Sequence, residues 1–99
     1  MDSVMAEYRD GVLSIEVAGG FTLPFFKDFY TAYKSLQVAP AAVEVDLAQT
    51  ESIDGIGFGM LLSMRNYFGA DMPMRLRNAN PTVQKNLRIA RLDKYFTID

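Results

Sequence analysis

The stretch VEVDLAQTESIDGIGFGMLLSMRNYF, residues 43 to 68, decides the fold of this chain. Apolar residues at 43, 45 and 47 alternate with acidic residues at 44 and 46, and this period of two predicts a strand with one buried and one solvated face. Asp54 follows Ile53 and can accept a hydrogen bond from a free amide as a helix N-cap. The glycines at 55, 57 and 59 let the backbone pack closely where a helix begins near Ile56. The stretch therefore predicts a strand, a turn carrying Asp54 and a helix.

The composition is that of one small domain. The chain has 99 residues, 49% of them hydrophobic, and a formal net charge of −2, which allows a single core. It contains no cysteine and no histidine, so it lacks thiol chemistry and the commonest general base and metal ligand. We therefore expect no enzyme activity, no cofactor and no metal site.

The sequence also bears on location and on nucleic acids. Its acidic start has no apolar run behind basic residues, which is unlike a signal peptide, and about 18 consecutive apolar residues, as a membrane span needs, occur nowhere. Lysine and arginine form no cluster, which argues against a nucleic-acid binder. These patterns predict a cytoplasmic protein without a membrane span.

Further strands are expected on both sides of the opening stretch. Residues 4–8 and 12–17 predict a hairpin around Asp10-Gly11, residues 74–78 alternate again, and residues 95–98 form a short last strand or a tail. Strands joined through helices are parallel with right-handed crossovers, and neighbouring strands would place all helices on one face. The open face would then bring Glu44 and Asp46 opposite Arg75 and Arg77 as weak ion pairs.

Two more helices are predicted from caps and stripes. Thr22 is expected to cap the first, with Pro24 in its first turn, and the pair Asn80-Pro81 begins the last. Phe21 and Phe25 fall outside the apolar stripe of the first helix, so we expect them to be partly exposed and available to a partner. The expected core-facing residues are Phe26, Phe29, Tyr33 and Leu36 in the first helix, Phe58, Leu61, Leu62, Met64 and Phe68 in the middle one, and Val83, Leu87 and Ala90 in the last.

From about Gly11 to Ile98 the chain resembles the bacterial STAS domain, the fold of anti-sigma factor antagonists. The resemblance lies in the opening stretch and in MRLRNANPTVQKNLRIARLDKYFTI, residues 74–98. GGFTLPFFKDFYTAY, residues 19–33, and LDKYFTI, residues 92–98, are similar to proteobacterial members that act in partner-switching circuits. The resemblance implies an α/β fold with a four- to five-stranded mixed sheet and helices mainly on one face. It also implies a protein partner, which is an anti-sigma factor or the serine kinase or phosphatase of such a circuit.

The turn departs from the family pattern at the phosphoacceptor. Relatives carry a hydroxyl where this chain reads Asp54-Gly55-Ile56-Gly57, and Ile56 has no oxygen to phosphorylate. In such circuits phosphorylation ends binding by adding about two negative charges to a surface that the partner must desolvate. We therefore predict a domain that stays competent to bind. Ser52 and Thr50 are the nearest substitute hydroxyls, although hydrogen bonding within a loop is their more ordinary role.

Three functions compete at this point. The first is a regulatory module, a monomer or weak dimer, that binds its partner through Phe21, Thr22, Asp54, Gly55, Ile56 and Gly57. The second is a small-molecule or lipid-sensing STAS domain of a transport or signalling system. The third is an enzyme, which the sequence disfavours because Asp54 has no carboxylate companion except Glu51 and Asp46. Whether Asp54 is only a cap, and whether Ile56 is a core residue or a contact, stays open.

Overall fold

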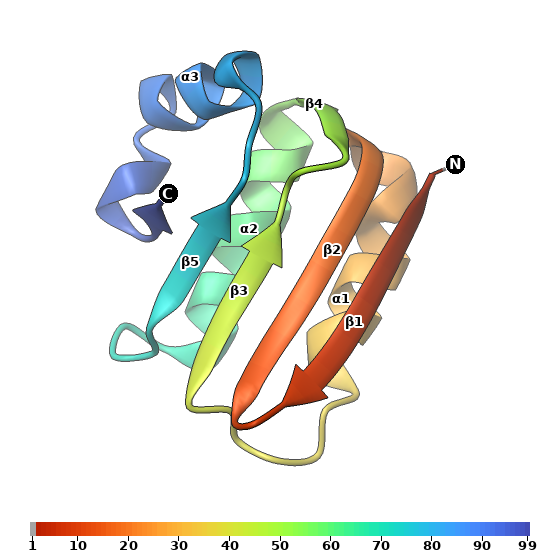
Figure 1. Ribbon diagram of the computed structural model, residues 1–99, viewed down its shortest axis with the longest axis vertical. Helices are drawn as coiled ribbons and strands as arrows, with labels where there is room; N and C mark the ends of the chain where they lie inside the picture. Colours follow the sequence, from red (N-terminus) through yellow and green to blue (C-terminus); the bar gives the residue numbers. More distant parts are fainter. Residues whose placement is uncertain (1) are drawn as a thin grey trace.

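The sheet grows from an antiparallel hairpin, drawn in red and orange in Figure 1. The computed structural model describes residues 2–99. β1 (Ser3–Arg9) pairs with β2 (Val12–Phe21) across a turn at Asp10 and Gly11. Their φ angles of 52° and 82° lie in the left-handed region, as tight hairpin turns that match the strand twist require. The predicted hairpin is therefore confirmed.

Parallel strands then add to β2 in one direction. β3 (Ala42–Asp46) pairs with β2, β5 (Met74–Arg77) with β3, and β6 (Thr97–Ile98) with β5. β4 (Thr50–Ile53) pairs with the end of β2, beside the path β1-β2-β3-β5-β6. The sheet is mixed as expected, but it has six strands rather than four or five. The extra count comes from β4 and β6, which are only four and two residues long.

Two helices cover one face of this sheet, and a third lies at its end. Both α1 (Phe26–Lys34) and α2 (Gly55–Phe68) run behind the strands in Figure 1, whereas α3 (Pro81–Ile89) lies beyond the end of β5. Turns of 3-10 helix at Leu23–Phe25 and Leu92–Lys94 precede α1 and follow α3. The expectation of helices mainly on one face is confirmed, but α3 lies at the end of the sheet, so the helices are not all on that face.

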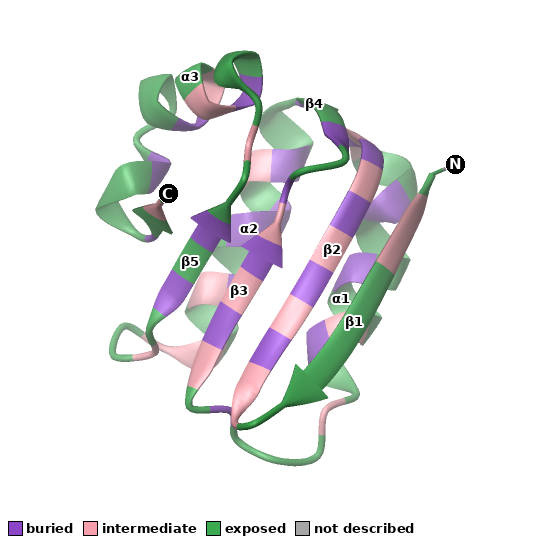
Figure 2. Ribbon diagram, viewed as in Figure 1, coloured by how far each residue is buried: buried purple, intermediate pink, exposed green. Residues whose placement is uncertain are grey.

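The core lies between the sheet and the helices α1 and α2, and α3 adds buried residues to it. Figure 2 shows the alternation of buried and less buried residues along β2, β3 and β5, which is the pattern of a sheet covered on one face only. The residues buried from the strands include Leu13, Ile15, Val17, Val43, Val45 and Leu76, and those from the helices include Phe29, Tyr33, Leu61, Met64, Val83 and Leu87.

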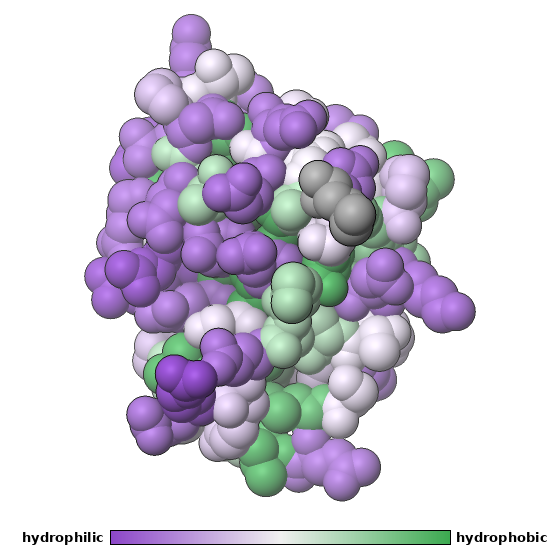
Figure 3. All heavy atoms as spheres, turned by 45° about the vertical axis from the view of Figure 1, so that its right-hand side comes forward, coloured by the Kyte–Doolittle hydropathy of each residue, from purple (hydrophilic) through white to green (hydrophobic). Residues whose placement is uncertain are grey.

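The other face of the sheet is open and polar. Figure 3 shows hydrophilic side chains gathered over this face, on the left of the view. Arg77 Nη1 lies 3.4 Å from Glu44 Oε2, whereas Arg75 Nη2 lies 3.0 Å from Asp99 Oδ2. Asp46 instead accepts hydrogen bonds from the Ala48 amide and from Asn78. Both arginines lie on the predicted face, but of the expected ion pairs only Arg77 with Glu44 forms. Arg75 pairs with Asp99 instead, and Asp46 is engaged by the Ala48 amide and by Asn78 after β3.

The start of α1 differs from the prediction. Thr22 makes no side-chain cap bond and its hydroxyl faces the Gly20 carbonyl oxygen, while the helix begins after a 3-10 turn at Phe26. β2 keeps its period of two up to Phe21, which is buried, and the 3-10 turn buries Phe25. Phe26 is 51% exposed. The expected exposure of Phe21 and Phe25 and the expected burial of Phe26 are therefore wrong.

Two smaller corrections concern the other helices. Ala90 is exposed, because α3 ends at Ile89 and Ala90 follows it as the C-cap residue, whereas Leu87 is the last buried residue of the helix. Leu62 of α2 is also exposed, although it was expected on the apolar arc. The predicted cap of α3 is confirmed, since Asn80 Oδ1 accepts a hydrogen bond of 2.8 Å from the Val83 amide.

Candidate partner-binding site

The first turn of α2 is anchored by Asp54. Its carboxylate Oδ1 accepts a hydrogen bond of 2.9 Å from the Gly57 amide, and its carbonyl oxygen accepts one of 3.0 Å from the Phe58 amide. The backbone of Asp54 is extended, with φ of −117°, as an N-cap residue requires. The predicted cap is confirmed, and the exposed rest of this side chain lies on the protein surface.

Only one of the three glycines at this helix start is required by packing. A Cβ at Gly57 would overlap the Phe21 carbonyl oxygen and would lie 2.7 Å from Ile53 Cγ1. At Gly55 and Gly59 a Cβ would meet nothing within 4 Å. Gly57 therefore lets α2 pack directly on the ends of β2 and β4, whereas the fold gives no such reason for the other two.

Ile56 lies on the surface of the domain. It is 47% exposed, although it stands between the exposed Gly55 and the buried Gly57. The alternative left open by the sequence, a core position for this residue, is therefore excluded. On the neighbouring loop Thr22 is half-buried and Leu23 is exposed.

The remaining predicted site residues are divided between surface and core. Phe21 contributes only its carbonyl oxygen near Gly57, because its ring is fully buried. Thr50 is 2% exposed, and its hydroxyl donates a hydrogen bond of 2.7 Å to the Val17 carbonyl oxygen. It is therefore inaccessible to a kinase in the folded domain. Ser52 is exposed and stays a prediction.

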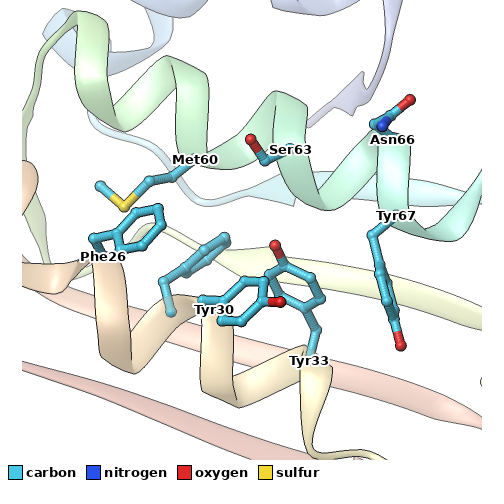
Figure 4. A pocket seen from close by; sticks show the side chains of 8 residues that line it. Phe26, Tyr30, Tyr33, Met60, Ser63, Asn66 and Tyr67 are labelled. Carbon is cyan, nitrogen blue, oxygen red and sulfur yellow. The ribbon is translucent and has the colours of Figure 1, made fainter.

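A groove between α1 and α2 was missed by the sequence analysis. It has a volume of about 260 Å³, and Figure 4 shows aromatic side chains of both helices around it. The rings of Phe26 and Tyr30 are parallel with centroids 6.2 Å apart, and Lys34 Nζ lies 4.7 Å from the ring centroid of Tyr67. The lining residues are Phe26, Phe29, Tyr30, Tyr33, Met60, Ser63, Asn66 and Tyr67. The spacing of Phe26, Tyr30 and Lys34 along one helix face is the signal that the sequence offers, but the aromatic stripe of the same helix predicts Phe26 in the core.

One residue of the groove, Tyr33, has the only clearly shifted pKa among residues 2–99. Burial raises the pKa of the Tyr33 phenol, and the nearby phenols of Tyr30 and Tyr67 raise it further. Across the same residues there is no cluster of three side chains that could hold a metal ion. Nor does this part of the chain contain a helix long and apolar enough to cross a membrane.

Comparison with known proteins confirms the resemblance. A family model described as "Mlab, STAS domain" matches residues 5–98. A STAS-domain containing protein of Pseudomonas aeruginosa (strain UCBPP-PA14) is 32% identical over 87 residues, which are 87% of this chain and 86% of that protein.

Solved structures agree in fold. An anti-sigma factor antagonist from Mycobacterium paratuberculosis has a TM-score of 0.82 at 19% identity, over 99% of this chain and 85% of that one. A sulfate transporter family protein from Wolinella succinogenes has a TM-score of 0.71 at 14% identity, over 92% of this chain and 80% of that one. The family model spans nearly the whole chain, and the chain therefore belongs to the STAS-domain family.

Proposed function

We propose that this chain is a non-enzymatic regulatory module of the cytoplasm that binds a protein partner through the surface around Thr22, Asp54, Gly55 and Ile56. The observation that carries the proposal is the exposure of Ile56, an isoleucine at 47% accessibility on the first turn of α2. The likeness in fold to an anti-sigma factor antagonist supports an anti-sigma factor, or a kinase or phosphatase of the same circuit, as the partner class.

The proposed binding is not switched by phosphorylation at this turn. Isoleucine cannot accept a phosphate, so the charge that would repel a partner cannot be added at residue 56. Its exposed side chain offers apolar area instead, and full burial of an isoleucine contributes about 1.5 to 3 kcal/mol. The domain is then permanently competent to bind, and its regulation must act elsewhere.

The first experiment identifies the partner by photo-crosslinking. A photo-crosslinking residue placed at Ile56 in the native cells should capture a protein that mass spectrometry identifies, and the same residue placed at the exposed Ile89 of α3 should not.

Calorimetry with the purified partner then measures affinity. Ile56→Glu should weaken binding at least about tenfold, or about 1.4 kcal/mol, because it introduces a charge that must be desolvated. Ile56→Ser should bind more weakly than the unmodified chain but more tightly than Ile56→Glu, because it removes apolar area without adding a charge, and Ile89→Glu is the matched control. Equal affinity of Ile56→Glu and the unmodified chain would remove the turn from the interface.

The aromatic groove favours a second candidate, a small-molecule sensor. Its volume of about 260 Å³ is slightly below that of typical ligand pockets, and its walls are mostly aromatic. A molecule retained in native mass spectrometry of the purified chain, and lost in Tyr30→Ala, would support this candidate. A bare chain mass under the same conditions would count against it.

A further inference from the structure

The side of α2 that faces solvent carries almost no charge. Of its fourteen residues only Arg65 is charged, and this guanidinium donates hydrogen bonds to the carbonyl oxygens of Ala70 and Met72. Leu62 and Tyr67 are 37% and 46% exposed on the same helix. The exposed side of a surface helix normally carries charged residues, whereas here the polar residues exposed besides Tyr67 are only Ser63 and Asn66, so this side of α2 is suited to contact another molecule.

The outermost positions of α2 follow a regular spacing. Since its buried residues are Gly57, Met60, Leu61 and Met64, the opposite side carries the residues that we call the α2 ridge. The α2 ridge consists of Gly55, Gly59, Leu62 and Asn66, spaced 4-3-4 as in helix pairs that pack along a seam.

The ridge has a low half and a high half. Gly55 and Gly59 have open space where a side chain would begin, although glycine is unfavourable relative to alanine inside an exposed helix. Leu62 and Asn66 form the high half, and Asn66 lines both the groove toward α1 and a second hollow toward Tyr95. One half of the ridge is thus shaped to receive the other.

We propose that the α2 ridge is a self-association surface on which two copies of the chain pack α2 against α2, antiparallel, about a two-fold axis. This arrangement sets Leu62 of one copy over Gly59 of the other and Asn66 over Gly55, so that each side chain enters the space left by a glycine. A parallel pair would oppose glycine to glycine and leucine to leucine. A two-fold interface requires such self-complementarity.

Charge supports the same pairing. Asp54 lies at the N-terminal end of α2, and Lys34 reaches its C-terminal end, with Nζ 4.7 Å from the ring centroid of Tyr67. Antiparallel packing brings Lys34 of each copy toward Asp54 of the other. The ridge itself carries no charge, so no like charges face each other along it.

The helix face is large enough for a stable contact. The molecule measures 33 × 29 × 20 Å, and Figure 1 looks down its shortest axis, so the layer of α1 and α2 forms one of the two broad faces. A standard interface of about 800 Å² per copy would cover roughly one-seventh of the 5792 Å² surface.

Self-association is measured on the chain alone and does not depend on the proposed function. If both hold, a dimer covers Gly55 beside Ile56 and competes with the partner for the same end of α2. A dimer that does not compete with the partner would support the α2 ridge as the self-association surface and would show that the partner binds elsewhere.

Sedimentation equilibrium tests the dimer. We expect the apparent mass to rise from 11.1 kDa toward twice that value over about three decades of concentration. Gly59→Arg should weaken association at least about tenfold, because it fills the low half of the ridge with a charge. It should leave the circular dichroism spectrum unchanged, since a Cβ at this position meets nothing. Ile89→Arg, also an exposed apolar position, is the matched control and should associate like the unmodified chain.

Cross-linking tests the geometry, because the chain contains no cysteine. Residues 55 and 66 are separated by about 16 Å along the helix axis, beyond the reach of a disulfide, whose Cα atoms lie within about 7 Å. Gly55→Cys and Asn66→Cys should therefore stay un-linked when oxidised alone and should link to each other when mixed. A mass that stays at 11.1 kDa, equal loss in Gly59→Arg and Ile89→Arg, or efficient linking of either cysteine variant alone would overturn the proposal.

Discussion

At the scale of single residues, neighbouring glycines that look alike in sequence have different roles. Gly57 is buried against the Phe21 carbonyl oxygen and the Ile53 side chain, whereas Gly59, two residues further on, borders open space. The caps at Asp54 and Asn80 were predictable because each acts on an amide three residues away. The glycine difference was not, since it depends on where β2 and β4 end relative to α2.

The two glycines should therefore respond in opposite directions to the same substitution. Gly57→Ala should lower the free energy of unfolding by about 1 to 3 kcal/mol, because the added methyl group cannot be accommodated without a shift of α2. Gly59→Ala should raise it by up to about 1 kcal/mol through helix propensity. Urea denaturation of both variants at low protein concentration measures this, and a neutral Gly57→Ala would show that α2 moves at little cost.

At the scale of elements, β4 connects β2 with the start of α3 through hydrogen bonds of Thr50. Its Thr50 hydroxyl donates to the Val17 carbonyl oxygen of β2, and the Asn80 side-chain amide donates to the Thr50 carbonyl oxygen at 3.2 Å. The Gly19 amide also donates to the carbonyl oxygen of Gln49, just before β4. This short strand therefore joins β2 to the start of α3, and it directly precedes the turn that carries Asp54.

Removal of the buried hydroxyl should loosen this junction. Thr50→Val keeps the shape of the side chain but loses its hydrogen bond, so the free energy of unfolding should fall by about 1 kcal/mol. Thr50→Ser should lose less, since it keeps the donor. The exposed Thr82 of α3 offers the control, because Thr82→Val should change stability by less than about 0.5 kcal/mol. Equal stability of both valine variants in urea denaturation would show that the bond contributes nothing.

Element boundaries were the weakest part of the sequence prediction. The strand β4 has no alternation, since its end residues are buried and its middle ones exposed, and a period of two could not reveal it. The pair Thr22 and Pro24 is typical of a helix start, yet β2 continues to Phe21 and a 3-10 turn intervenes. Because of this shift Phe25 is buried and Phe26 is exposed, the reverse of the prediction. The groove that Phe26 lines was therefore not predicted.

At the scale of the whole molecule, the architecture was predictable and the surfaces were not. Alternating strands with one wet face, joined through helices, allow few arrangements, and the one-sided helix layer follows from them. The groove depends on how α1 and α2 lie side by side, and the exposure of Ile56 depends on how the first turn of α2 packs on the ends of β2 and β4. No local sequence pattern shows either arrangement. Candidate contacts such as Tyr30 and Tyr67 therefore appeared only in the structure.

The buried phenol of Tyr33 makes the stability of the whole domain sensitive to alkaline pH. Its pKa is raised in the folded state by burial, then by Tyr30 and Tyr67, so the unfolded chain loses this proton first as pH rises. The contribution is fully present below about pH 10, the ordinary tyrosine pKa, and is lost as pH rises through the folded-state value.

Urea denaturation across this range should show a steeper alkaline loss of stability in the unmodified chain than in Tyr33→Phe. The exposed Tyr95 supplies the control, since Tyr95→Phe should leave the pH dependence unchanged. Parallel curves for all three proteins would contradict the assignment to Tyr33.

The order of the strands has a consequence for how the domain is made. Each strand after the first hydrogen-bonds to one that precedes it in the chain, and β3, β5 and β6 attach in turn to the growing edge. As the ribosome extends the chain, every newly emerged strand finds its neighbour already synthesised, and none has to be threaded between two that are already joined. The order of synthesis and the order of the strands from the N-terminal hairpin outward thus run in the same direction, and no strand after the first has to wait for a neighbour made after it in order to gain its first partner.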